Sequence, residues 1–81
     1  MNTPSWTPSP KKAQNAPDYV IEQIRNALLK KELNPGDRLP SELELATLFN
    51  VSRGSVRQAM KSLEILGILS IRPGNGTYIY T

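Results

Sequence analysis

The chain has 81 residues, a formal net charge of +3 and 38% apolar residues, which is enough for one small domain with a modest core. It contains no cysteine and no histidine, which excludes disulfides, thiolate metal sites and the commonest general base. No apolar run approaches the ~20 residues of a membrane span and the N-terminus lacks the apolar core of a signal peptide, so we expect a soluble cytoplasmic protein with no cofactor and no membrane partner.

Charge is distributed unevenly along the chain. Residues 18–50 carry four Lys or Arg against six Asp or Glu, whereas residues 51–81 carry four Lys or Arg against one Glu. A basic C-terminal half predicts one face that meets a polyanion, although an ordinary solvated face is an equal alternative on this observation alone.

Residues 1–16 are rich in Pro, Ser, Thr, Asn and Lys without periodicity, which predicts a flexible tail ahead of a single domain over residues 17–81. Asp18 follows Pro17 and is the expected N-cap of a helix that runs to about Lys31. Apolar residues recur there at helical spacing, and Gln23 is among the polar residues expected outside.

The "NPGD" stretch predicts a turn, and "RLP" after it predicts a short extended piece. Ser41 and Glu44 then form a capping-box pattern, in which each side chain satisfies a backbone donor at the helix start. The helix that follows is expected to end at Asn50, which tolerates a left-handed conformation, and Ser52 is expected to cap the next helix.

Residues 53–66 form the third expected helix, whose apolar residues recur at spacings of three and four. Gly67 stands where a helix C-terminus favours positive φ. Two β-branched and aromatic runs then flank "PGNG", a pattern typical of a β-hairpin. The fold class is therefore mainly α with a small hairpin (α+β).

A short helix, a three-residue turn and a second helix predict a helix-turn-helix. At ~100° per residue, Arg53, Arg57 and Lys61 share one face with Gln58 beside them, away from the apolar stripe. This arrangement fits the DNA major groove, where arginine is the best reader of guanine. The candidate contacts also include hydroxyls for phosphate, charge at the base of the hairpin and close backbone approach at its tip: Ser52, Ser55, Arg72, Gly74 and Gly76.

Simpler interpretations exist for each of these features. An arginine pair at spacing four is usually only solvated, capping serines need no ligand, and "PGNG" is more often a plain turn. A winged-helix protein–protein interaction module is the second functional hypothesis, and it predicts an exposed apolar patch on the third helix. An enzyme would need paired carboxylates, but Glu42 and Glu44 are explained by a helix start.

The stretch "PGDRLPSELELATLFNVSRGSVRQAMKSLEILGILSIRPGNGTYI" resembles the N-terminal winged-helix domain of the GntR family of bacterial transcription regulators. The shared blocks are Pro-Gly, Leu-Pro-Ser-Glu, Leu-Ala, Val-Ser-Arg, Val-Arg, Leu-Glu and Gly-x-Gly-Thr, in order and spacing. The resemblance covers residues 19–80, and several separated blocks make it specific.

The resemblance implies dimers that bind a palindromic operator in double-stranded DNA, with the third helix in the major groove and the wing tip in the minor groove. It implies base or phosphate contacts from Arg53 and Arg57, a phosphate contact from Ser41 and a wing-tip contact from Asn75. It also implies a metabolite-responsive regulator, most often a repressor, whose effector-binding C-terminal domain and main dimer contacts lie outside this chain. Many members have arginine where this chain has Leu43 and threonine where it has Gly54, so no particular operator sequence follows.

Overall fold

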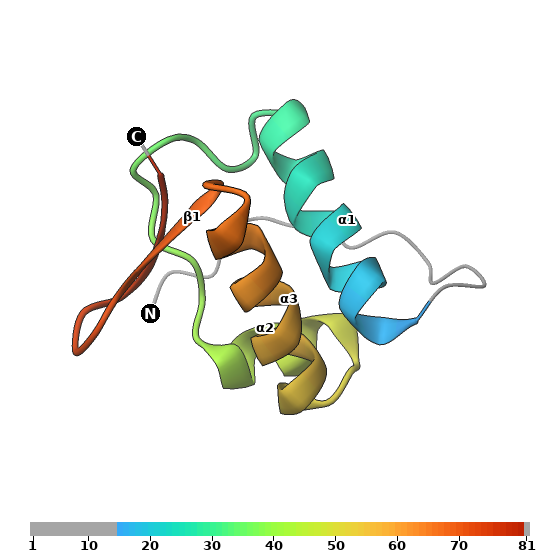
Figure 1. Cartoon of the computed structure of the whole chain (residues 1–81). Helices are drawn as coiled ribbons and strands as arrows, with labels where there is room; N and C mark the ends of the chain where they lie inside the picture. The colour runs from blue at the N-terminus through green and yellow to red at the C-terminus, as the bar shows by residue number, and fades with distance from the viewer. Residues whose placement is uncertain (1–14, 81) are drawn as a thin grey trace.

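A computed structural model describes residues 15–80, and these form three helices followed by a two-stranded antiparallel hairpin (Figure 1). The elements are α1 (Ala16–Leu29), α2 (Glu42–Phe49), α3 (Arg53–Ile65), β1 (Leu69–Arg72) and β2 (Gly76–Ile79). This order confirms the predicted winged helix-turn-helix. The predicted tail lies outside the described residues, apart from Asn15 and Ala16. None of the described helices is long and apolar enough to cross a membrane.

Helix α1 begins earlier than the sequence suggested. Asn15 is its N-cap, and the Asn15 side chain accepts a hydrogen bond of 2.9 Å from the backbone N–H of Asp18, so Asp18 is not the cap. Pro17 lies inside the first turn, where its missing N–H costs nothing. The helix ends at Leu29, two residues before the predicted end. Gln23 is buried rather than exposed, because α1 packs over a wider arc than its apolar stripe.

The boundaries of α2 and α3 follow the predicted caps. The Ser41 hydroxyl accepts from Glu44 N at 3.1 Å while the Glu44 carboxylate accepts from Ser41 N at 2.9 Å, which completes the capping box. Asn50 ends α2 in the left-handed region at φ 55°. Ser52 then caps α3 by accepting from Ser55 N at 3.1 Å. Only three residues separate the two helices, and this short turn fixes the angle of α3.

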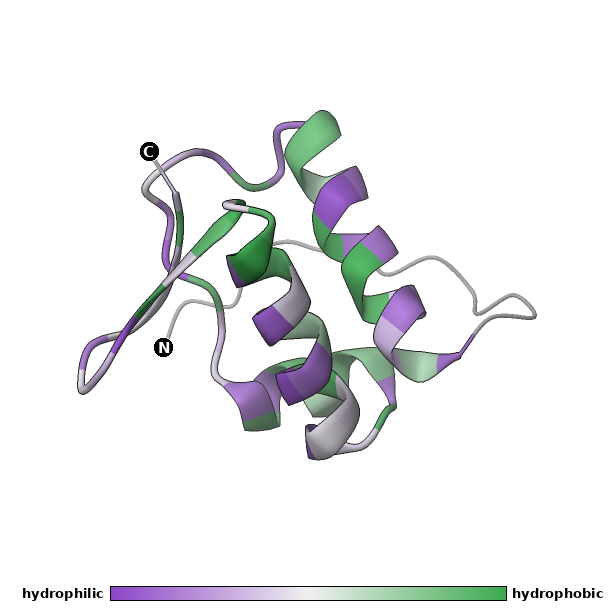
Figure 2. Ribbon diagram, viewed as in Figure 1, coloured by the Kyte–Doolittle hydropathy of each residue, from purple (hydrophilic) through white to green (hydrophobic). Residues whose placement is uncertain are grey.

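The core lies between α1, α2, α3 and the hairpin. Helix α3 contributes Val56, Ala59, Met60 and Leu63, all buried. Tyr19 of α1 meets Phe49 of α2 edge to face, with ring centroids 5.9 Å apart. In Figure 2, α1 and α3 carry hydrophobic and hydrophilic residues in alternation along their length, as amphipathic helices do. Burial of one side leaves the other side of α3 to solvent.

The segment ahead of α2 joins the hairpin. Arg38 forms a β-bridge with Tyr78, the N–H of Leu39 donates to Thr77 O at 2.8 Å, and the N–H of Ile79 donates to Asp37 O at 2.8 Å. The predicted extended piece is therefore confirmed, and it lines the free edge of β2. A two-stranded hairpin is marginal alone, so this third segment supports the wing.

The fold predicts opposite effects for one chemical change at two glycines. Gly67 has φ +78° with nothing within 4 Å of an added methyl group, so Gly67→Ala should lower the free energy of unfolding by about 1 kcal/mol through left-handed strain alone. Gly54 lies in the first turn of α3, where a methyl group would be 3.9 Å from the Ser52 hydroxyl. Gly54→Ala should raise stability by about 0.5 kcal/mol. Urea unfolding measures both, and equal effects at the two sites would contradict these boundaries.

Candidate nucleic-acid interface

The exposed side of α3 is basic along three turns. Arg53, Arg57 and Lys61 are all exposed, whereas the apolar residues between them in sequence are buried. Gly54 and Gln58 are exposed beside the arginines. The spacing predicted from the sequence is therefore confirmed as a geometric fact: packing of α3 presents this row of cations to solvent.

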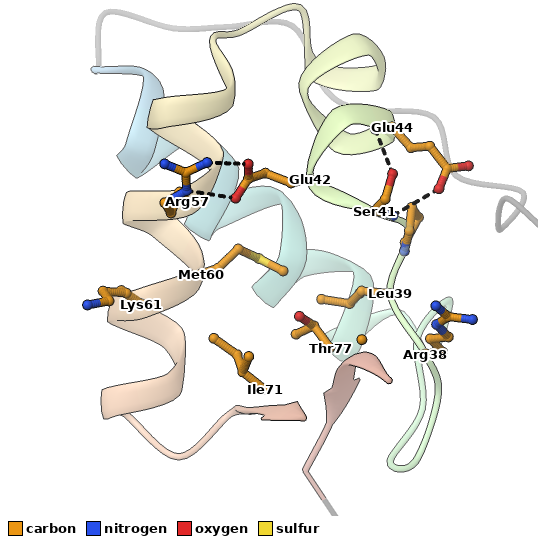
Figure 3. Close-up of a pocket in the computed structure, with 12 residues that line it drawn as sticks. Arg38, Leu39, Ser41, Glu42, Glu44, Arg57, Met60, Lys61, Ile71 and Thr77 are labelled. Carbon is orange, nitrogen blue, oxygen red and sulfur yellow. Dashed lines mark hydrogen bonds and ion pairs between the residues drawn. The ribbon is translucent and has the colours of Figure 1, made fainter. Parts of the chain in front are cut away.

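Glu42, the first residue of α2, contacts both arginines, and Figure 3 shows its pairing with Arg57. Its carboxylate accepts two hydrogen bonds from Arg57, from Nε at 3.0 Å and from Nη2 at 2.8 Å. Arg53 Nε lies 3.5 Å from Glu42 Oε1 as an ion pair. Like charges four residues apart on a helix destabilise it. Glu42 offsets that repulsion and holds the Arg57 guanidinium in one plane.

The pairing leaves Arg57 able to bind a ligand. A guanidinium has five N–H donors, and Glu42 takes two of them, which leaves three. The Arg57 side chain is 66% exposed, against 27% for Glu42. Glu42 therefore orients the guanidinium from behind while its outer edge faces solvent.

The same contacts set the protonation of Glu42. The hydrogen bonds from Arg57 hold the pKa of the Glu42 carboxyl below its ordinary value; partial burial acts in the opposite direction, and the positive charges of Arg57 and Arg53 lower the pKa further. The bonds to Glu42 raise the pKa of Arg57 in turn. Glu42 and Arg57 therefore both stay charged at neutral pH.

The predicted serines stand at the two helix starts. Ser41 and Ser52 are exposed caps, and Ser52 also donates from its hydroxyl to the Ser55 hydroxyl at 2.9 Å. The Ser41 hydroxyl accepts one bond and still has a hydrogen to donate. Helix N-termini carry partial positive charge, which suits a phosphate.

The hairpin places its predicted residues at the far end from the helices (Figure 1). The Arg72 guanidinium lies over the Tyr78 ring, 4.4 Å from its centroid, so it is held close to the strand. Asn75 closes the turn by donating its N–H to Arg72 O at 2.9 Å. Gly74 is exposed and Gly76 is half-buried. The two glycines therefore differ in surroundings.

Two residues near this face were not predicted as functional. Glu42 was assigned to the helix start, but its main partners are Arg57 and Arg53, 15 and 11 residues away in sequence. Arg38 was assigned only to an extended piece, yet it is exposed beside the hairpin. No local sequence pattern could have predicted the contact of Glu42 with the arginines or the position of Arg38 beside the hairpin. Among residues 15–80 no cluster of potential metal ligands occurs.

The Glu42 geometry predicts an acid-side pH dependence. The pKa of Glu42 is lower in the folded chain than in the unfolded chain. The Glu42–Arg57 pair therefore stabilises the fold at pH values above the pKa that Glu42 has in the unfolded chain, and this stabilisation is lost as the pH falls through the pKa of Glu42 in the folded chain. Arg57→Ala should raise the Glu42 pKa toward its ordinary value, and Arg53→Ala should raise it less. Carboxyl-carbon NMR titration measures this, with Arg25→Ala on α1 as control. An unchanged Glu42 titration in Arg57→Ala would contradict the pairing.

Comparison with known proteins connects this geometry to a family. Residues 18–79 match the family described as bacterial regulatory proteins, gntR family. The chain is 42% identical over 67 residues to the Uxu operon transcriptional regulator of Escherichia coli strain K12, covering 83% of this chain and 26% of that protein. It is 42% identical over 62 residues to the HTH-type transcriptional repressor YtrA of Bacillus subtilis strain 168, covering 76% of this chain and 48% of that protein. The chain thus spans less than half the length of either regulator.

A solved structure extends the similarity to three dimensions. The AraR DNA-binding domain in complex with operator ORX1 superimposes with a TM-score of 0.79 at 29% sequence identity, covering 88% of each chain. The family match runs from the first turn of α1 to the end of β2 and so includes the helix-turn-helix and its wing. The chain belongs to the GntR family of bacterial transcription regulators and carries that family's DNA-binding domain.

Proposed function

We propose that this domain binds a specific operator in double-stranded DNA, with α3 in the major groove and the tip of the hairpin in the adjacent minor groove. Arg53, Arg57 and Gln58 face the bases, and Lys61 meets the backbone. The observation that carries the proposal is the exposed basic face of α3, which stands beside the capped start of α2 and the hairpin. The major groove is about 12 Å wide and admits a helix presented in this way.

The remaining contacts follow from their places around α3. Ser41, Ser52 and Ser55 hold phosphates at the two helix starts, where the backbone N–H groups point outward. Arg72, Gly74 and Asn75 approach the minor groove from the hairpin. The AraR domain that this chain resembles was solved with an operator, which supports DNA as the ligand.

The whole regulator is proposed to be a cytoplasmic, metabolite-responsive repressor. Bacillus YtrA, a relative, is a repressor by name, which supports that sign of regulation. A homodimer on a palindromic operator and an effector bound by a second domain, both implied by the resemblance to the family, complete the proposal. The chain itself spans about a quarter of the Uxu regulator.

The interaction-module hypothesis predicts an apolar patch on the same face of α3. Its exposed residues there are charged or polar, and the exposed Ile65 and Leu66 lie at the opposite end of the helix. DNA is therefore the better partner for the face. The family is one of transcription regulators, which agrees with the prediction that the chain is not an enzyme.

The proposal predicts where DNA perturbs the backbone. In an amide NMR titration with a duplex selected from a random pool by this chain, shifts should concentrate at residues 52–58 and 73–77. They should weaken at higher salt, because phosphate contacts release counterions. A scrambled duplex is the control. Shifts scattered over α1 instead, or equal affinity for both duplexes, would refute sequence-specific binding by this face.

Two single substitutions should separate base contacts from backbone contacts. Arg53→Ala should cost about 1–3 kcal/mol on the selected duplex and relax preference at one base pair. Lys61→Ala should weaken selected and scrambled duplexes alike and reduce the slope of log K against log salt by about 0.9. Fluorescence anisotropy on single-base variants of the duplex measures both. Uniform weakening by Arg53→Ala would reassign it to the backbone.

A further inference from the structure

A groove of about 880 Å³ lies between α3 and the chain segment that precedes α2. Figure 3 shows Lys61 on the α3 side and Arg38 on the opposite side, with Leu39, Met60, Ile71 and Thr77 between them. The groove therefore has a cation at each side and a largely apolar floor. The groove is lined by three cations, Arg38, Arg57 and Lys61. Arg57 and Lys61 are already proposed to contact DNA because they lie on α3, whereas Arg38 is not.

The backbone of Arg38 is held in place, whereas its guanidinium has no carboxylate partner among residues 15–80. Its backbone is bridged to Tyr78, so the stem of the side chain starts from β-structure. The side chain is exposed, and within residues 15–80 its guanidinium makes no ion pair. Lys61 likewise has no carboxylate partner there. Within residues 15–80, neither of these two exposed cations is paired with a carboxylate.

The guanidinium of Arg38 lies against Gly76. A methyl group added at Gly76 would be 2.8 Å from Arg38 Nε and 3.2 Å from Nη2, so the guanidinium would have to shift from its place. At Gly74, by contrast, an added methyl group meets nothing within 4 Å. The absent side chain at Gly76 therefore makes room for the arginine. Gly76 thus lies under Arg38, and it also has φ +120°, a backbone conformation that favours glycine.

The two carboxylates that line the groove do not block an anion. Glu42 is held by Arg57 at 2.8 Å, and Glu44 accepts from the N–H of Ser41 at 2.9 Å. With Arg57 paired to Glu42, two cations, Arg38 and Lys61, have no carboxylate partner within residues 15–80, and the floor between them is largely apolar. A sugar-phosphate strand has matching chemistry, because anionic phosphates alternate with apolar deoxyribose faces.

We propose that this groove holds the backbone of one DNA strand, that Arg38 donates to a phosphate in it, and that Gly76 is a positioning residue for Arg38. A deoxyribose then packs on the exposed Ile71, and Lys61 meets a phosphate at the other side. The inference rests on the proposed function and adds a contact from outside the helix-turn-helix. It also replaces a direct DNA contact by Gly76 with an indirect one.

The test compares Arg38→Ala, Arg38→Lys and the matched control Arg25→Ala, which removes the same charge from the exposed side of α1. Binding to the selected and scrambled duplexes is measured over a range of salt. Arg38→Ala should weaken both duplexes alike and reduce the salt slope by about 0.9, as loss of one phosphate contact does. Arg38→Lys should keep the slope, and Arg25→Ala should leave it near that of the wild type.

The role of Gly76 is tested by a double-mutant cycle with Gly76→Ala. Gly76→Ala strains the backbone at φ +120° in both backgrounds. If Gly76 also positions Arg38, its effect on binding should be larger in the wild-type background than in Arg38→Ala. Additive effects would show that Gly76 acts independently of Arg38 and overturn its positioning role. Melting temperatures confirm that each variant is folded.

The outcomes distinguish this inference from the function on which it rests. A wild-type domain that prefers the selected duplex, together with an Arg38→Ala slope no smaller than that of Arg25→Ala, would overturn the groove assignment alone. A wild-type domain that binds selected and scrambled duplexes equally would instead refute the proposed function.

Discussion

Burial of one side of α3 is the constraint on which the rest of the structure depends. Val56, Ala59, Met60 and Leu63 contribute to a core shared with α1, α2 and the hairpin, and a small domain has no second core to replace it. Once that stripe is buried, the angular position of every other α3 residue is determined. The basic face is therefore a consequence of packing, and a change that rotates α3 would move all of its cations together.

The second constraint is the attachment of the hairpin. Two short strands twist and fray when they stand alone. Here the segment from Gly36 to Leu39 hydrogen-bonds to β2 and then leads directly into the cap of α2. The hairpin and the start of α2 are thus placed by one continuous piece of chain. This explains how elements far apart in sequence form a groove of defined width.

Capping and turn residues close together in sequence predicted most boundaries of the helices and the hairpin. Side-chain pairs between different elements could not be predicted in this way. The Ser41 capping box, left-handed Asn50 and Gly67 each carry their pattern within a few residues, so their boundaries could be predicted. The N-cap of α1 was misplaced because Asn15 and Asp18, three residues apart, are both good capping residues, although Pro17 in the first turn favours the earlier start. The Glu42–Arg57 pair joins two helices whose mutual orientation no local pattern gives.

Glu42 lowers the net charge of the Arg53–Arg57 cluster but leaves N–H donors of both arginines free to contact a ligand. The long-range attraction of an anion and its contact with the arginines therefore depend on different features of the cluster. At distances larger than the spacing of the three groups, Arg53, Arg57 and Glu42 act together as a single positive charge, two cations less one anion. Salt screens this attraction beyond about 8 Å. The cluster therefore contributes one positive charge, not two, to the approach of a polyanion, and cations elsewhere on the surface contribute the rest. The N–H donors of the two arginines act only at contact. The rate of encounter and the lifetime of the complex can therefore change independently, since different side chains control them.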